Sequence, residues 1–310
     1  MYMSTILITG GTGLLGTAMT GFLTANGYEV IILTRSLNGK SSSANISYAA
    51  WNVEDNYIDV AALQKADHII HLAGAGVMDK KWSADYKKEI LESRTESSRL
   101  ISDTLKKIDH KVQTIVSASA IGWYGEDKLK NKAFTEDDPS DPNFLGETCK
   151  LWETSITEAG NSGVRVCKIR IGILLSNRGG ALVEFLKPLK FGTAAILGSG
   201  RQYISWIHID DVCRIFLHAI ENNTMSGSYN AVAPSPVTNA SFIVQMAQIF
   251  KGKNFIIAHV PIFILKVMLG QRSTEILKSA TVSCTKIKAA GFQFLYPSLE
   301  AALTRLANKN

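Results

Sequence analysis

A glycine-rich turn near the start of the chain restricts the possible folds more than any other feature. The apolar run Thr5–Thr9 is typical of a buried parallel strand, and a run with helical character follows it and ends at Gly27. Between the two runs stand Gly10, Gly13 and Gly16. A tight glycine turn between a strand and a helix exposes backbone N–H groups and a helix N-terminus, both of which attract a pyrophosphate. The segment therefore predicts a dinucleotide-binding α/β unit.

The end of the second predicted strand, at residues 29–34, indicates which dinucleotide fits. An Asp or Glu usually stands there and accepts a hydrogen bond from the ribose of NAD. This chain has Arg35 followed by Ser36. An arginine cannot accept that hydrogen bond, but its planar fork suits a 2′-phosphate. NADP(H) is therefore favoured over NAD(H), and the alternative is an exposed loop arginine without a ligand.

Further strands, separated by helical segments, extend the pattern. Strand-like runs occupy residues 66–72, 112–120 and 163–175, and a helix is expected over roughly 84–108. Strands separated by helices at this spacing predict a Rossmann-type, doubly wound parallel sheet, whose ligands gather at the carboxyl ends of the strands. The candidates for cofactor contact are Gly10, Thr12, Gly13, Leu14, Leu15, Gly16, Arg35, Ser36, Ala73, Gly74, Gly76, Ser117 and Arg170.

The second half of the chain divides between this sheet and a smaller lobe. After residue 176 the pattern becomes irregular and rich in glycine, whereas 203–232 again reads as a strand and a helix that begins near Asp210. We therefore expect residues 1–175, with 203–232, to form the nucleotide-binding domain. Residues 176–202 and 233–310 are expected to form a substrate lobe and a carboxy-terminal region.

Several side chains near the predicted cleft are open to more than one interpretation. Ser119 and Tyr124 follow a strand and lie near the site by topology, although Ser119 could simply cap its loop. Arg94 falls on the apolar stripe of its helix, so it must either be paired or face a polar cavity. The cations that could together hold a nucleotide diphosphate are Lys81, Arg94, Arg170, Arg201 and His208, each of which also has an ordinary structural role available.

Composition argues against several other classes of protein. The net charge of +6 is modest, and the lysines and arginines alternate with acids, which is typical of solvated helix faces and not of a nucleic-acid surface. The four cysteines are far apart, and His68 and His71 would point to opposite faces of one strand, so no metal site is expected. We see no export signal, and the apolar run 260–269 is too short to span a bilayer. A cytoplasmic protein without membrane or nucleic-acid partners is expected.

Long segments resemble the extended short-chain dehydrogenases/reductases of the sugar-nucleotide epimerase and dehydratase group, most closely the YfcH-like epimerase branch. The segments that carry the resemblance are TGGTGLLG, HLAGAG, SASAIGWYG, FLGETCKLWE, RIGILLS, GSGRQYISWIHIDDV and GFQFLYPSLEAAL. The resemblance covers nearly the whole chain. It implies an NAD(P)-binding sheet of about seven strands, a carboxy-terminal lobe, a small-molecule substrate such as a nucleotide sugar, and a homodimer.

The resemblance also implies a catalytic set that this chain only partly retains. Active members of the wider superfamily use a Ser together with a Tyr-x-x-x-Lys pair. Ser119 matches the Ser, whereas Leu145 and Cys149 fall at the Tyr and Lys positions. Lys150 is one residue beyond the Lys position. One hypothesis is an NADP-dependent oxidoreductase or epimerase with Tyr124 as proton donor, or less favourably Cys149. The other is an NADP(H)-binding regulatory or interaction protein without turnover.

Overall fold

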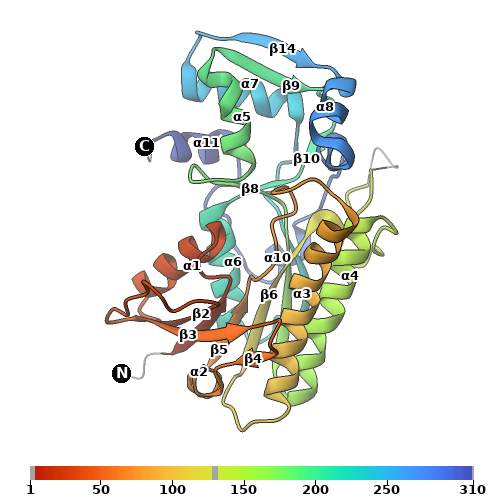
Figure 1. Ribbon diagram of the computed structural model, residues 1–310. Helices are drawn as coiled ribbons and strands as arrows, with labels where there is room; N and C mark the ends of the chain where they lie inside the picture. The colour runs from red at the N-terminus through yellow and green to blue at the C-terminus, as the bar shows by residue number, and fades with distance from the viewer. Residues whose placement is uncertain (1–3, 128–131, 309–310) are drawn as a thin grey trace.

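A mostly parallel sheet forms the larger half of the molecule (Figure 1). The computed structural model describes residues 4–127 and 132–308. Its main sheet has eight strands in the order β12-β7-β6-β5-β1-β2-β3-β4, and all neighbours are parallel except β3 and the short β4. The strands are β1 (Thr5–Thr9), β2 (Glu29–Thr34), β3 (Ile46–Asn52), β4 (Tyr57–Ile58), β5 (His68–His71), β6 (Thr114–Ala120), β7 (Arg165–Ile171) and β12 (Gly227–Ala231). The predicted doubly wound sheet is confirmed.

The order of the strands fixes where a ligand can lie. From β1 the chain proceeds through β2 to β3 on one side, and later through β5, β6, β7 and β12 on the other. Thr9 at the end of β1 pairs with Leu33 of β2 and with His71 of β5. The direction of winding therefore reverses between β1 and β5. In open α/β sheets, ligands bind outside the carboxyl ends of the strands at this reversal.

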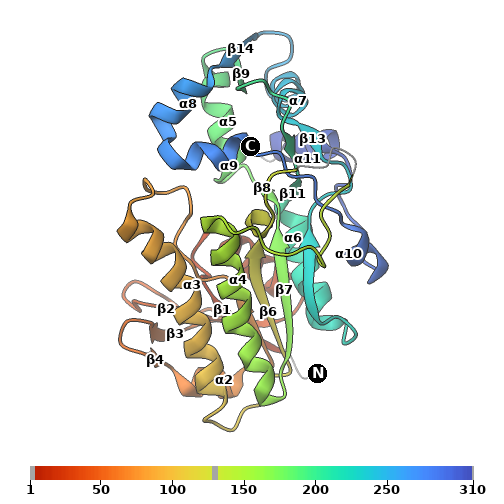
Figure 2. The ribbon, with the colours of Figure 1, turned by 90° about the vertical axis from the view of Figure 1, so that its right-hand side faces the viewer.

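Helices cover both faces of the sheet (Figures 1 and 2). One face carries α1 (Leu14–Ala25) and α6 (Ile209–Glu221), and the other carries α2 (Val60–Lys65), α3 (Ala84–Leu105) and α4 (Phe144–Thr157). Successive side chains of a strand point to opposite faces. Ile6 and Ile8 accordingly pack with α1, whereas Leu7 packs with α2 and α3. Burial on both faces explains why the first strand is apolar throughout.

A smaller lobe lies beyond the carboxyl ends of the strands (Figure 1). Its separate core includes Leu182, Trp206, Phe242 and Leu303. Among the described residues, no helix has the length and apolar character needed to cross a membrane. The lobe and the segments beside it contain α5 (Ala181–Lys190), β9 (Thr193–Leu197), β10 (Tyr203–Ile204), β13 (Val237–Thr238), α7 (Asn239–Lys251), β14 (Ile256–Val260), α8 (Ile262–Leu269), η3 (Gly270–Arg272), α9 (Ser273–Leu277) and α11 (Leu299–Ala307).

The run at 163–175 forms two strands and not the single one that we expected. The chain leaves the main sheet at Gly172 and continues as β8 (Ile173–Leu175), which pairs with β11 (Trp206–His208). A Cβ at Gly172 would lie only 2.6 Å from the carbonyl oxygen of Ser205. The glycine therefore permits a close approach of two backbones at the boundary between the sheet and the lobe.

Part of the carboxy-terminal region returns to the main sheet. Helix α10 (Thr285–Ala289) contacts β12, and its Ile287 shares a core with Ile8. The buried carboxylate of Asp211 on α6 accepts hydrogen bonds from the backbone N–H groups of Leu295 and Tyr296, at 2.8 and 2.9 Å. The expected division at residue 233 therefore assigns to the lobe a segment that packs on the nucleotide-binding side.

A buried histidine links β5 to its neighbours. His71 lies within hydrogen-bonding distance of the Thr9 hydroxyl on β1, at 2.7 Å, and of the Ser98 hydroxyl on α3, at 3.1 Å. Its side chain is fully buried. Burial, helped by the positive charge of Arg94, lowers the pKa of His71 from 6.5 to about 3. The imidazole is therefore neutral in the folded protein at neutral pH.

We expect His71 to make the fold less stable in mild acid. The unfolded chain protonates this histidine near pH 6.5 and the folded chain only near pH 3, so the unfolded state binds more protons as the pH falls below 6.5. Between pH 7 and pH 5 the free energy of unfolding should fall by about 1–2 kcal/mol more in the wild type than in His71→Gln. Urea denaturation at both pH values measures this. The exposed His259→Gln is the control, and equal losses in wild type and His71→Gln would contradict the prediction.

Candidate functional site

The glycine turn after β1 has the shape of an anion site. Gly10 has φ of 68°, and an added Cβ at Gly16 would lie 2.2 Å from the carbonyl oxygen of Gly10. These two glycines therefore close the turn tightly. Gly13 differs, because its nearest contact to an added Cβ is 3.4 Å away. A glycine is therefore not needed at position 13 to avoid a clash within the chain. The space beside Gly13 is open to a ligand.

The N-terminus of α1 is left open for an acceptor. Gly13 is its N-cap, and no side chain of the described residues caps this end or places a carboxylate in its first turn. Thr12 is exposed and Leu14 and Leu15 are half-buried. The N–H groups of a first helical turn need acceptors from outside the helix. The predicted loop residues therefore present backbone donors and the positive end of a helix dipole, and they fit a pyrophosphate.

The loop after β5 lies beside the glycine turn at the carboxyl ends of the strands. It contains the predicted small residues Ala73, Gly74 and Gly76. The N–H group of Ala75 donates to the Ser93 hydroxyl on α3 at 2.9 Å, and that of Ala73 to the Thr9 hydroxyl at 3.2 Å. These two hydrogen bonds fix the position of the loop relative to β1 and α3. Gly74, between the two anchored residues, is exposed.

The end of β2 carries an exposed cation. Arg35 and Ser36 are both exposed, and the Thr34 hydroxyl donates to the carbonyl oxygen of Ser36 at 3.0 Å. Within the described residues, Arg35 forms no ion pair with a carboxylate. Its guanidinium is therefore available to an anionic group of a ligand.

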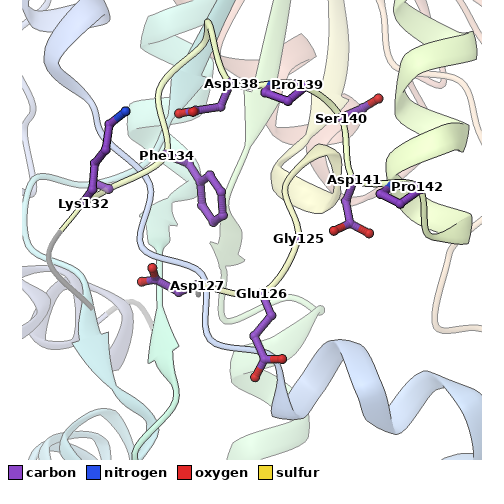
Figure 3. Close-up of a pocket in the computed structure, with 11 residues that line it drawn as sticks. Gly125, Glu126, Asp127, Lys132, Phe134, Asp138, Pro139, Ser140, Asp141 and Pro142 are labelled. Carbon is purple, nitrogen blue, oxygen red and sulfur yellow. The ribbon is translucent and has the colours of Figure 1, made fainter. Parts of the chain in front are cut away.

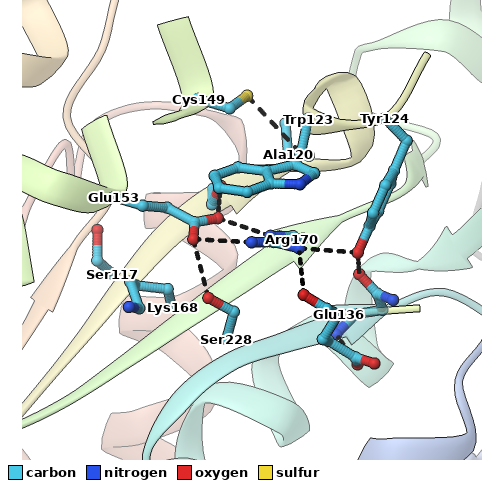
Figure 4. Close-up of polar contacts among 12 residues, drawn as sticks. Ser117, Ala120, Trp123, Tyr124, Glu136, Cys149, Glu153, Lys168, Arg170 and Ser228 are labelled. Atoms are coloured by element: carbon cyan, nitrogen blue, oxygen red, sulfur yellow. Dashed lines mark hydrogen bonds and ion pairs between the residues drawn. The ribbon is translucent and has the colours of Figure 1, made fainter. Parts of the chain in front are cut away.

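A buried ion pair ties α4 to the sheet (Figure 4). Glu153 of α4 accepts from Arg170 of β7 through both oxygens, at 2.7 and 3.1 Å, and the two side chains are only 7% and 3% exposed. The hydroxyls of Ser119 and Ser228 also donate to Glu153, at 2.7 and 2.8 Å. Burial alone would lower the pKa of Arg170, but the hydrogen bonds and charge of Glu153 outweigh it and raise that pKa.

This ion pair engages side chains that we predicted to contact ligands. Arg170 and Ser119 are 2% exposed and Ser117 is fully buried, with its hydroxyl donating to the carbonyl oxygen of Ala118. The structure therefore does not support cofactor contact by Arg170 or Ser117, or substrate contact by Ser119. Arg170 instead stacks 3.7 Å from the centre of the Trp123 ring in the short helix η1 (Ile121–Trp123).

Tyr124 is also part of the core, and the structure does not support it as a proton donor. Its hydroxyl donates to Asn230 at 2.7 Å and accepts from Arg170 at 2.9 Å, and its side chain is fully buried. Burial raises the pKa of Tyr124 to about 12, although Arg170 acts in the opposite direction. A phenol that is buried, doubly hydrogen-bonded and this weakly acidic cannot exchange protons with a substrate in the cleft.

Leu145 and Cys149, which the resemblance aligns with the Tyr and Lys of the wider superfamily, face the end of β6. An added Cβ at Gly122 would lie 3.4 Å from Cβ of Leu145 and 3.7 Å from Sγ of Cys149, so both residues lie on one face of α4 toward this loop. Burial and the charge of Glu153 raise the pKa of Cys149 to about 11, against the opposing charge of Arg94. The thiol is therefore neutral and unreactive. Lys150 is exposed on another face, 3.8 Å from Glu147.

The five cations proposed for a diphosphate do not share one environment. Lys81 and Arg201 are exposed, Arg94 is half-buried, and Arg170 and His208 are in the core. His208 caps α6, because its Nδ1 accepts from the N–H group of Asp210 at 3.0 Å, and its ring lies 4.0 Å from that of Tyr296. Substrate contact by His208 is therefore not supported. The described residues also contain no cluster of His, Cys, Asp and Glu that could hold a metal.

A pocket of about 300 Å³ opens beside the loop that follows Tyr124 (Figure 3). Its lining includes the acids Glu126, Asp127, Asp138 and Asp141 and one cation, Lys132. Like charges repel, so a phosphorylated group is disfavoured here. This pocket is therefore a poor candidate for a diphosphate site. The described residues that line it are Gly125, Glu126, Asp127, Lys132, Ala133, Phe134, Asp138, Pro139, Ser140, Asp141 and Pro142.

Sequence reasoning missed several buried polar side chains that organise the packing around the sheet. Glu153, Asn230 and Asp211 are buried polar side chains with several partners each. A signal for Glu153 was present, because a carboxylate on the apolar face of an amphipathic helix requires a buried cation. No comparable local pattern identifies Asn230, whose partner Tyr124 is 106 residues away in sequence.

Comparison with known proteins agrees with this architecture. Residues 6–232 match the NAD dependent epimerase/dehydratase family, and residues 260–306 match a domain of unknown function, DUF1731. The chain is 36% identical over 305 residues to the epimerase family protein YfhF of Bacillus subtilis (strain 168), with 97% of each chain covered.

Two solved structures are similar over nearly the whole chain. Human epimerase family protein SDR39U1 (isoform 2), solved with NADPH, has a TM-score of 0.86 and 29% identity, covering 99% of this chain and 100% of the human one. A nucleoside-diphosphate sugar epimerase from Corynebacterium glutamicum has a TM-score of 0.77 and 30% identity, covering 99% of this chain and 59% of the other. Fold, glycine turn and sequence agree, and the chain belongs to the NAD dependent epimerase/dehydratase family.

Proposed function

We propose that the protein binds NADP(H) and acts on a small molecule as a reductase or epimerase that lacks the Tyr-x-x-x-Lys pair. The observation that carries the proposal is Arg35, an exposed cation without an ion-pair partner among the described residues, at the end of β2. The open N-terminus of α1 would hold the pyrophosphate, and Arg35 the 2′-phosphate. The human relative was solved with NADPH, which supports this choice of cofactor. When bound, the cofactor supplies or accepts a hydride.

The same relatives support a substrate class. The similar protein from Corynebacterium glutamicum is described as a nucleoside-diphosphate sugar epimerase, so a nucleotide sugar is our proposed type of substrate. Lys81 and Arg201 are exposed and remain the proposed contacts for its phosphates. The family resemblance leads us to propose a homodimer as well, and we keep the sequence-based expectation of a cytoplasmic protein.

A second candidate function is a non-catalytic NADP(H)-binding protein that regulates or docks a partner. The observation that favours it is the absence of a suitable acid–base group at the two vacated positions: Leu145 is apolar, and the pKa of Cys149 is about 11. With Tyr124 also buried, a proton for turnover would come from solvent, and turnover would be slow.

Gly13→Val should abolish NADPH binding and leave the protein folded. The new side chain meets only the carbonyl oxygen of Gly10, at 3.4 Å for its Cβ, so the chain accommodates it, but it occupies the space proposed for the pyrophosphate. Calorimetry measures binding, and circular dichroism measures folding. Gly21→Val on the same helix is the matched control, because nothing lies within 4 Å of its Cβ. Normal NADPH binding by a folded Gly13→Val protein would place the phosphate site elsewhere.

Arg35→Ala should reduce the preference for NADPH over NADH. Loss of one charge-assisted contact with the 2′-phosphate costs about 1.5–3 kcal/mol, so NADPH affinity should fall roughly tenfold or more. NADH has no 2′-phosphate, and its affinity should stay unchanged, which makes it the internal control. The two dissociation constants are measured by calorimetry. If the wild type binds both cofactors equally, the assignment to NADP(H) fails.

A screen of nucleotide sugars with NADPH tests turnover. We expect weak activity that survives in Cys149→Ser, because the thiol is neutral at working pH and plays no part in proton transfer. The readouts are NADPH absorbance and product analysis. Loss of activity in Cys149→Ser would make the thiol the reactive group. Tight NADPH binding without turnover on any substrate would instead support the non-catalytic function.

A further inference from the structure

Arg94 of α3 is a half-buried cation with few partners in the protein. Its Nη1 donates to the carbonyl oxygen of Ile90 at 2.8 Å, and its guanidinium carbon lies 5.1 Å from the centre of the Trp152 ring. No carboxylate of the described residues forms an ion pair with it, in contrast to Arg170. A guanidinium has five N–H donors, and a half-buried one is stabilised by additional acceptors. Arg94 therefore has hydrogen-bonding capacity that the protein itself does not use.

The guanidinium lies directly beneath the loop after β5. An added Cβ at Gly74 would lie 3.0 Å from Cζ and 3.3 Å from Nε of Arg94. Because Gly74 has no side chain, there is room for the guanidinium of Arg94 beneath the loop. Arg94 is also close enough to Cys149 for the charge of each to affect the pKa of the other. It thus lies between the β5 loop and the position on α4 where the superfamily has its lysine.

The topology of the sheet indicates which half of a dinucleotide would pass this point. The pyrophosphate is proposed to lie at the N-terminus of α1, and the 2′-phosphate at Arg35 after β2. Strands β2 and β5 flank β1 on opposite sides. A dinucleotide that crosses the reversal point with its adenosine half toward β2 must place its other half toward β5 and β6.

We propose that Arg94 donates hydrogen bonds to the ribose hydroxyls on the nicotinamide side of the dinucleotide, and so replaces from α3 the lysine that α4 lacks. The proposal rests on the proposed binding of NADP(H). Cys149 is too short and is uncharged, whereas the longer arginine side chain brings a fixed positive charge to the loop after β5 and to Trp152 of α4. Arg94 has no phenol to activate, because residue 145 is a leucine. Its role is therefore to bind and orient the cofactor and not to transfer a proton.

The test compares NADPH with a fragment that lacks the nicotinamide riboside. The fragment, 2′-phosphoadenosine 5′-diphosphate, retains both the diphosphate and the 2′-phosphate. In Arg94→Met, NADPH affinity should fall roughly tenfold while affinity for the fragment changes less than twofold, because only the former contacts residue 94. Arg94→Lys should recover part of the loss. Arg99→Met on the same helix is the matched control, because Arg99 is exposed and paired with Glu96.

The fragment also reports on folding, since its binding requires an intact glycine loop. If NADPH affinity is unchanged in Arg94→Met, or if both ligands lose affinity equally, the proposal is overturned. Equal loss would mean that Arg94 only supports the fold beneath Gly74. A wild type that binds neither ligand would refute the proposed function itself, which is a different result from a wild type that binds both.

Discussion

The buried pair of Glu153 and Arg170 is the interaction on which the arrangement of the site depends. It joins α4 to β7, and its hydrogen bonds extend to Ser119 on β6 and Ser228 on β12. One carboxylate thus fixes a helix relative to three adjacent strands. Removing one partner of such a pair leaves an uncompensated buried charge, which is strongly destabilising. The orientation of α4, and with it the face that carries Leu145 and Cys149, follows from this pair.

A consequence is that the position of α4 does not depend on the chemistry of the side chains that it presents. Helix α4 is held firmly in place, and the face that it turns toward the end of β6 carries an aliphatic side chain and a neutral thiol. The polar residues nearby, Ser119 and Tyr124, point into the core and stabilise it. Near the reversal point of the sheet, the start of α1 offers backbone donors and Arg35 is exposed, and both are suited to holding a dinucleotide.

Local patterns in the sequence predicted the sheet and the glycine turn because each depends on nearby residues. The run TILIT and the glycine that follows it, Gly10, are visible within a short window. The partners of Ser119 and Tyr124 lie 34 and 106 residues away, so topology could place these residues at a strand end but not show which way they point. The break at Gly172 was missed for a similar reason, since it depends on the backbone of Ser205.

The passage between sheet and lobe at Gly172 has a mechanical consequence. Three segments cross it side by side and are cross-linked by backbone hydrogen bonds: Gly172 N–H to Ala231, Ile173 N–H to Ser205, and Ala233 N–H to Trp206. Three linked segments resist bending far more than one flexible linker would, because bending must strain several backbone hydrogen bonds at once. The connection between sheet and lobe is therefore stiff, and adjustment to a ligand falls to the loops at the carboxyl ends of the strands.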